Sequence, residues 1–325
     1  MYAALLGLVA EGSGKVTFKD VNLKEFKEFM PSIGIAVQYD HPEYFWFTGG
    51  YTYSYKKGSE VCDITVEPIF YDYVTPFFNR EEKLSELNKR VKQVALLAKE
   101  HSADDYERII FVHDYLIKNA VYDTDSLDEY YKTTHSPSCE YIFTAYGCLV
   151  NGKTVCSGYA KAFQLIMYEL GYDCSYVVGS AGESHGWNCV YFDGDGYFID
   201  VTWDDADYER EVPLYNYAFI NEETLTKTHT IEMPFKTPVC DEDEHNFYIK
   251  KGYYLEKYSY SAAAKILSKQ SKNESAYIKF GSAEALDMAI NDFSKAGGIT
   301  NIPGLENAVS YSYNKTHNSV VVFLE

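Results

Sequence analysis

The sequence is short of positive charge. Its 325 residues include 29 lysine and arginine residues against 48 aspartate and glutamate residues, which gives a formal net charge of −19. Nucleic acids and anionic membrane surfaces attract proteins through clustered basic side chains. The composition therefore argues against both as partners of this protein.

Long apolar runs are also lacking. The longest covers residues 3–10, which is far too short for a bilayer, since a spanning helix needs about 20 apolar residues. No positively charged stretch precedes this run, as a signal peptide would require. Two locations stay open: the protein remains inside the cell, or this chain begins after an export signal that has been removed.

Several kinds of site are missing. There is no Gly-rich phosphate loop and no C-x-x-C pair, which excludes nucleotide-loop and zinc-ribbon interpretations. Residues 240–245, Cys-Asp-Glu-Asp-Glu-His, are of metal-binding types, but adjacent residues rarely point the same way. We interpret them as a solvated loop, and we expect neither a metal nor a cofactor.

Apolar residues, by contrast, are plentiful. They make up 46% of the chain, enough for a substantial core, and the length predicts two or three folded units. We divide the chain into an N-terminal region (1–78), a core (79–250) and a small α/β appendage (251–325).

Periodicity and caps predict elements in each region. The first is expected to open with a short helix and continue as strands at 44–47, 51–55 and 61–70. Two helices follow, the first capped by Asn79 with Glu82 and the second by Ser102 with Asp105. The appendage is expected to contain helices at 262–269 and 283–295 and strands at 276–280, 308–313 and 319–324.

One cysteine lies where a loop turns into an apolar helix. The helix after Cys156 has apolar residues at three- and four-residue spacing and a glycine stop at Gly171. A helix start presents unpaired N–H groups, which favour a thiolate over a thiol. Taken alone, a cysteine here also fits a small buried apolar residue.

A histidine and an aspartate follow in a suitable order. His185 and Asp200 lie on two neighbouring strand-like runs, and the segment Asp193-Gly194-Asp195-Gly196 predicts the hairpin that joins them. A thiol, a base and an acid in this arrangement form a nucleophile–base–orienter set.

The same stretch resembles the core of the transglutaminase-like superfamily of papain-like cysteine enzymes. The resemblance rests on Cys156 opening a buried helix, on His185 followed by Trp187 and Asn188, and on the run Asp200-Val201-Thr202-Trp203. It is strong over residues 141–205 and weaker over 20–250. It implies an α+β fold in which the helix bearing the cysteine packs on an antiparallel sheet.

The resemblance also implies roles for individual residues. Cys156 would be the nucleophile, His185 the general base and acid, and Asp200 the group that orients the imidazole. The oxyanion would bond the Cys156 N–H and a second donor, for which we select Tyr146, because aromatic residues often lie upstream in this superfamily. Trp187 is assigned to substrate binding.

The name of the reaction stays open. Water as the acceptor makes a peptidase or amidase, and a lysine amine makes a cross-linking transglutaminase. We favour hydrolysis, because bacterial relatives with a short core lack the additional β-domains of the animal cross-linking enzymes. A third reading is a non-catalytic protein that binds a cell-wall peptide or glycan. The expected partner is a protein or peptide substrate, with a location leaning towards the exterior or cell surface.

The seven cysteines are an odd number, so at least one is unpaired. Cys174 and Cys189 lie on adjacent predicted strands. A disulfide and two packed thiols are both compatible with that placement.

Overall fold

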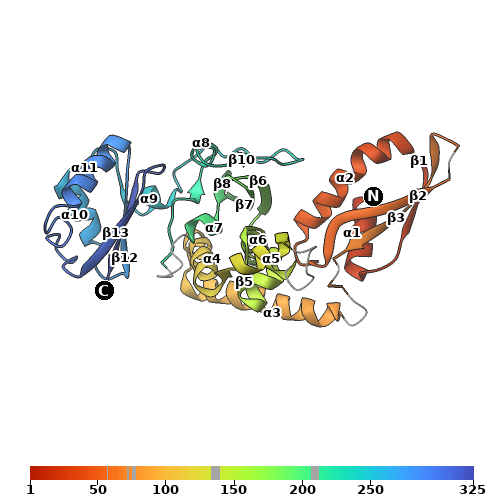
Figure 1. The fold of residues 1–325 in the computed structure, drawn as a ribbon, viewed down its shortest axis with the longest axis horizontal. Helices are drawn as coiled ribbons and strands as arrows, with labels where there is room; N and C mark the ends of the chain where they lie inside the picture. Colours follow the sequence, from red (N-terminus) through yellow and green to blue (C-terminus); the bar gives the residue numbers. More distant parts are fainter. Residues whose placement is uncertain (57, 72, 75–77, 133–139, 206–211) are drawn as a thin grey trace. The chain divides into compact units, whose positions relative to one another are not determined.

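The fold is α+β, with 43% helix and 25% strand (Figure 1). The computed structural model describes residues 1–56, 58–71, 73–74, 78–132, 140–205 and 212–325. They form two compact units, one of residues 1–190 with 231–237 and one of residues 191–230 with 238–325. The division of the chain at residues 78 and 250 remains a prediction.

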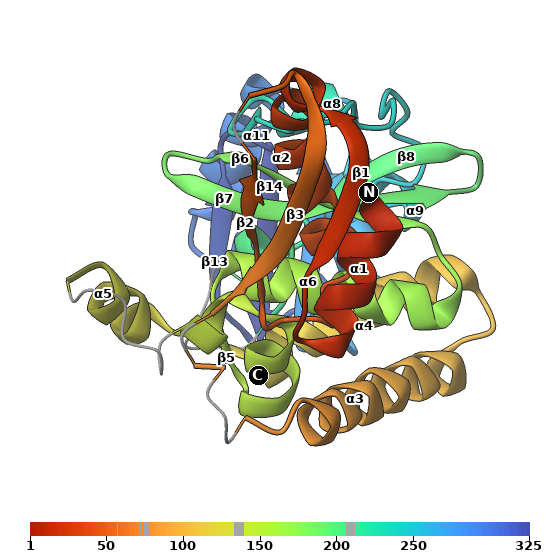
Figure 2. The ribbon, with the colours of Figure 1, turned by 90° about the vertical axis from the view of Figure 1, so that its right-hand side faces the viewer.

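The N-terminal part of the first unit is a three-stranded antiparallel sheet with two helices packed on it (Figure 2). The strand order is β1-β3-β2, and the side chains of both helices enter one apolar cluster with those of the sheet. The elements are α1 (Tyr2–Glu11), β1 (Val16–Asn22), α2 (Leu23–Asp40), β2 (Phe47–Tyr55) and β3 (Val61–Phe70).

The long helix α2 was not expected in a strand-rich region. Pro31 lies inside it, and Gly34 follows one turn later, two residues that argue against a helix in a sequence. Gly34 is required by packing, because a Cβ there would overlap the carbonyl oxygen of Gly49 in β2. The expected strand at 44–47 is wrong except for Phe47, where β2 begins.

Two long helices come next, α3 (Arg80–His101) and α4 (Asp105–Asn119). The Asn79 cap is confirmed, since its side chain accepts from the Glu82 N–H at 3.2 Å and donates to the Glu82 carboxylate at 3.0 Å. The Ser102 cap is wrong. Ser102 ends α3, and Asp104 caps α4 by accepting from the Glu107 N–H.

The Cys156-bearing helix, α6 (Cys156–Leu170), packs on an antiparallel sheet, as the resemblance implied. It ends at Gly171 in the left-handed conformation. The sheet has the order β10-β6-β7-β8-β9. Its strands are β6 (Cys174–Ser180), β7 (Ser184–Phe192), β8 (Asp195–Ile199), β9 (Ala218–Ile220) and β10 (Thr230–Ile231). The smaller elements are β4 (Val121–Tyr122), α5 (Thr124–Lys132), η1 (Glu140–Phe143), η2 (Gly147–Asn151), β5 (Lys153–Thr154), α7 (Val201–Asp204) and α8 (Glu222–Leu225).

The second unit ends in a four-stranded sheet of order β11-β12-β14-β13 with helices against it (Figure 1). Every helix and strand expected after residue 260 is present. The elements are α9 (Phe247–Lys250), β11 (Tyr254–Leu255), α10 (Tyr260–Ser268), β12 (Ser275–Phe280), α11 (Ala283–Phe293), β13 (Ala308–Asn314) and β14 (Ser319–Leu324).

Cys174 and Cys189 are separate thiols. Cys189 pairs with Ser175, and Cys174 pairs with Val190. Neighbouring residues of a strand point to opposite faces, so the two sulfur atoms lie on different sides of the sheet. Cys139 lies outside the described residues.

None of the helices in the described part of the chain combines the length and the apolar character that crossing a membrane requires.

Candidate active site

Cys156 is the first residue of α6, and its side chain is half-buried. The first turns of α6 are held by the carbonyl oxygen of Phe143 in η1. That oxygen accepts from the Ser157 hydroxyl at 3.1 Å and from the Lys161 ammonium at 3.0 Å. Because both groups bond one oxygen, the ammonium lies at the helix start, beside the residue that follows the thiol.

His185 is the second residue of β7 and is buried. Its backbone pairs with Gly179 in β6. Its ring stacks on the Trp187 indole, with 5.8 Å between centroids and 22° between planes. Trp187 therefore supports the imidazole from one side, and its own side chain is 1% exposed. The assignment of Trp187 to substrate binding stays a prediction.

Two contacts connect the strand of His185 with the helix of Cys156. The Tyr176 hydroxyl in β6 donates to the Ser157 hydroxyl at 3.2 Å. The same phenol lies over Gly186, where an added Cβ would be 2.5 Å from the hydroxyl oxygen. Tyr176 thus contacts the neighbours of both Cys156 and His185.

The second connection is made by Asn188 in β7. Its side-chain amide donates to the carbonyl oxygen of Ala160 in α6 at 3.0 Å, and the residue is 1% exposed. A buried amide bonded in this way fixes the strand against the helix.

Asp200 follows β8 and caps the short helix α7. Its Oδ1 accepts from the N–H groups of Thr202 at 3.0 Å and Trp203 at 3.1 Å. The sequence Asp-Val-Thr-Trp is therefore a local capping unit, in which the aspartate ends a strand and starts a helix.

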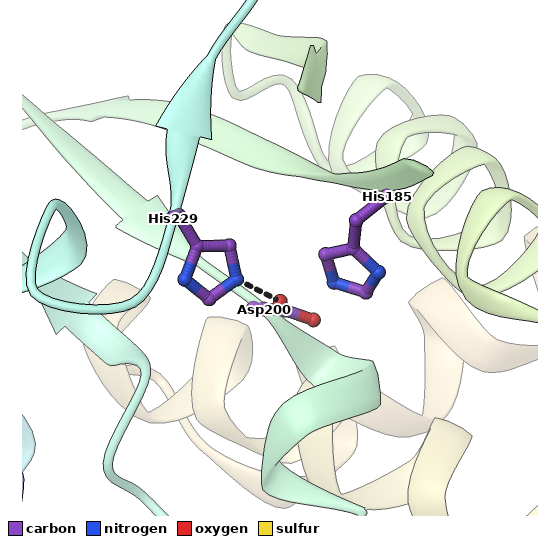
Figure 3. A group of neighbouring side chains, drawn as sticks. All are labelled: His185, Asp200 and His229. Carbon is purple, nitrogen blue, oxygen red and sulfur yellow. Dashed lines mark hydrogen bonds and ion pairs between the residues drawn. The ribbon is translucent and has the colours of Figure 1, made fainter. Parts of the chain in front are cut away.

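The other carboxylate oxygen of Asp200 bonds a histidine that the sequence did not reveal. His229 Nε2 lies 3.1 Å from Asp200 Oδ2, and both side chains are buried. His185, Asp200 and His229 form one group of neighbouring side chains (Figure 3). One ring nitrogen of each histidine and one carboxylate oxygen of Asp200 lie within 4.8 Å of one another. His229 was missed because no spacing or motif in the sequence links it to Asp200.

Lys161 was also missed. Loss of hydration lowers the pKa of the Lys161 ammonium to about 8, while attraction to Cys156 raises it. The ammonium also lies 5.4 Å from the centre of the Tyr176 ring. The signal in the sequence was its place between Ala160 and Ala162 in the mainly apolar first half of this helix, where a lysine is unusual.

Tyr146 lies just before η2 and is buried. Its hydroxyl donates to the Glu86 carboxylate and accepts from the Lys83 ammonium at 3.3 Å, and its ring stacks on Phe45 at 4.9 Å. Its assignment as an oxyanion donor stays a prediction.

The loop at 240–245 is only in part the solvated segment that we expected. Residues 241–244 are exposed, but Cys240 and His245 are buried. His245 Nδ1 accepts from Lys250, and Nε2 lies 3.4 Å from Asp193 and 3.3 Å from Glu244. Asp193, Glu244 and His245 are close enough together to hold a metal ion. The expectation that the protein has no metal remains a prediction.

Residues 93–201 match the family model described as the Transglutaminase-like superfamily. No curated protein matches the chain. Among solved structures, it is similar to a TGase at 12% identity and a TM-score of 0.36, with 58% of this chain and 51% of that chain covered.

Two further similar structures are a candidate cysteine protease from Cytophaga hutchinsonii and a candidate protease from Parabacteroides distasonis. The first is 13% identical with a TM-score of 0.28, covering 48% of this chain and 63% of that one. The second is 11% identical with a TM-score of 0.28, covering 60% and 41%. This chain thus spans less than two thirds of each of the three proteins.

Proposed function

We propose that this protein hydrolyses amide bonds through a thioester, because residues 93–201 match the model of the transglutaminase-like superfamily, a family of cysteine peptidases and transglutaminases. The proposed catalytic residues are Cys156, His185 and Asp200. The substrate class is a protein or peptide.

The reaction proceeds in two halves. The Cys156 thiolate attacks the amide carbonyl carbon, the C–N bond breaks, and His185 gives its proton to the departing amine. Water then attacks the thioester and passes a proton to His185. The C–S bond breaks, and the carboxylic acid and the Cys156 thiolate are released. Asp200 keeps the imidazole in the orientation that both transfers need.

The observation that carries this proposal is the position of Tyr176. One side chain touches the residue after Cys156 and the residue after His185, so a thiol and an imidazole are presented from a helix start and an adjoining strand. The helix start supplies N–H groups, and the Lys161 ammonium adds positive charge. Both favour a thiolate.

The developing oxyanion needs two donors. We assign the Cys156 N–H as the first and retain Tyr146 as the proposed second. Tyr146 shares its hydroxyl with Glu86 and Lys83, so it would have to exchange one of these bonds for the substrate oxygen.

Hydrolysis and cross-linking share the acylation half and differ in the acceptor. A labelled primary amine offered with a glutamine-rich protein separates them, because incorporation of the amine reports cross-linking and release of ammonia or peptide without incorporation reports hydrolysis. We expect hydrolysis.

The proposal is tested first by alkylation with iodoacetamide between pH 5 and 9, with peptide mapping of every cysteine. We expect Cys156 to react much faster than the other thiols near pH 6, and His185→Ala to remove that advantage. Cys156→Ala should abolish turnover and leave the unfolding temperature nearly unchanged, since the change removes little volume.

Equal reactivity of Cys156 and the other thiols, or turnover by Cys156→Ala, contradicts the assignment. Binding of a cell-wall peptide or glycan that Cys156→Ala retains without any turnover by the wild-type protein would support the non-catalytic reading.

A further inference from the structure

Asp200 has two carboxylate oxygens with separate partners in the second unit. Oδ1 accepts the two N–H groups that start α7, and Oδ2 faces His229 Nε2 at 3.1 Å. A carboxylate accepts hydrogen bonds, so His229 is the donor. We propose that His229 is a positioning residue, whose hydrogen bond fixes Asp200 in the orientation that catalysis requires. This inference rests on the proposed function.

The far side of the imidazole is equally well held. His229 Nδ1 lies 2.8 Å from the Thr228 hydroxyl, and that hydroxyl lies 3.1 Å from the Tyr217 hydroxyl. Nε2 donates to Asp200 whichever way the Thr228 and Tyr217 hydroxyls are oriented, and these hydroxyls hold the ring from its far side.

Aromatic rings fix the plane of the imidazole. The Trp203 ring is 4.6 Å from the His229 ring, and the Tyr217 ring is 5.3 Å from it. Trp203 belongs to α7, the helix that Asp200 caps, and the Asp200 N–H donates to the Tyr217 carbonyl at 3.1 Å. The same two aromatic residues therefore hold both members of the pair.

The physical role follows from these contacts. A carboxylate held only through Oδ1 can rotate about its Cβ–Cγ bond within the limits of the helix cap. A buried donor on Oδ2 removes that freedom and satisfies an oxygen that is shielded from water. An orienting acid whose position is fixed keeps the imidazole aligned for both proton transfers.

Two substitutions separate the hydrogen bond from the ring. His229→Gln keeps a donor, because the glutamine Nε2 reaches nearly as far as the histidine Nε2, and it loses the ring. His229→Phe keeps the ring between Trp203 and Tyr217 and loses the donor. His317→Phe is the matched control, because His317 is also buried and also packs on Tyr217, at 4.6 Å.

Each variant is compared with the wild-type full chain by kcat and KM on a peptide substrate, by the pH profile of Cys156 alkylation, and by thermal unfolding. We expect His229→Phe to lower kcat about ten- to hundredfold, the effect of a lost hydrogen bond to a charged group. KM should change little, the alkylation profile should shift, and His229→Gln should recover most of kcat. His317→Phe should leave kcat within about twofold.

If a folded His229→Phe protein has the kcat and the Cys156 alkylation profile of the wild type, the inference about His229 is overturned and the proposed function still stands. Equal losses in folded His229→Phe and His229→Gln also overturn it, because the donor would then be irrelevant. If the wild-type Cys156 reacts no faster than the other thiols, the proposed function itself fails and takes the inference with it.

Discussion

At the scale of single residues, Lys161 places an ammonium group at the start of α6. Its ammonium is tied to the Phe143 carbonyl at 3.0 Å, and the attraction between Cys156 and Lys161 opposes the loss of hydration that lowers the pKa of the lysine to about 8. The lysine is therefore largely charged at neutral pH and loses its charge as the pH rises above about 8.

Lys161→Met should slow the alkylation of Cys156 near pH 6.5 by about five- to thirtyfold. The attraction between the ammonium and the thiolate that the variant loses is roughly 1–2 kcal/mol at an effective dielectric constant near 20. Lys161→Arg should restore most of the rate. Lys92→Met, on the exposed face of α3, is the control. A Lys161→Met protein that reacts like the wild type would show that the ammonium serves the fold alone.

The sequence singles out Cys156, His185 and Asp200 as candidates because each lies in a local pattern: a helix start, a histidine followed by Trp187, and an aspartate after a hairpin. His229 has no such local signature. It reaches Asp200 only because the chain returns after β9 and α8, a tertiary event that no spacing records.

At the scale of elements, the start of α6 is pressed against the segment that precedes it. A Cβ on Gly158 would overlap the Thr154 hydroxyl and lie 2.6 Å from the Ile142 carbonyl oxygen and 2.9 Å from that of Thr144. Glycine at this place is what allows the helix bearing the thiol to approach η1.

Gly158→Ala should lower the free energy of unfolding by about 1–3 kcal/mol, the usual cost of overpacking, and should reduce Cys156 alkylation by displacing the helix start. Gly7→Ala is the matched control. Gly7 lies in α1 with nothing near its Cβ position, so alanine there should add about 0.5–1 kcal/mol. Urea unfolding of both variants and the wild type measures the two changes in unfolding free energy, one negative and one positive. A Gly158→Ala protein as stable as the wild type would contradict the packing argument.

Element type was predictable where periodicity and caps agreed. The Asn79 cap, the glycine stop of α6 and the helices and strands after residue 260 followed from the sequence, whereas α9 and β11 did not. The helix α2 did not, because Pro31 and Gly34 weaken the helical signal and their acceptance depends on tertiary packing. Ser102 was misplaced as the N-cap of α4 because it is the C-cap of α3, and the N-cap of α4 follows two residues later at Asp104.

At the scale of the whole molecule, the last sheet is joined to the segment that follows Asp200 within the second unit. The Tyr277 hydroxyl donates to the Pro213 carbonyl at 3.0 Å, and Ser319 donates to the Asn216 side chain at 2.6 Å. Tyr215 stacks on Phe247 at 3.6 Å. The two hydrogen bonds cross the predicted boundary at residue 250, and no pattern in the sequence indicates any of the three contacts.

His317, in the same region, makes the free energy of unfolding depend on pH. Burial, and then the positive charges of Lys279 and Lys227, lower the pKa of His317 from 6.5 to about 3. Below pH 6.5 the His317 ring binds a proton in the unfolded chain, whereas in the folded protein it stays neutral until the pH approaches 3. Stability contributed by the neutral ring is therefore complete above pH 6.5 and is lost as the pH falls towards 3.

The slope of unfolding free energy against pH should include up to about 1.4 kcal/mol per pH unit from His317 between pH 6.5 and 3. His317→Phe should remove this part of the slope. Above pH 7 the unfolding free energies of the variant and the wild type should depend on pH in the same way. Urea unfolding at pH 4, 5, 6 and 8 measures both. Parallel curves for the two proteins across the acid range would contradict the burial argument.

The order of the chain has a consequence for its biosynthesis. Synthesis delivers Cys156 first, then His185 and Asp200, and His229 only after β9 and α8 have been made. On the proposed assignments, a nascent chain carries its nucleophile before the donor that fixes the acid. A ribosome-bound or prematurely ended chain would therefore expose a thiol with little catalytic power, and proteolytic activity towards the cell's own proteins would wait until most of the polypeptide is complete.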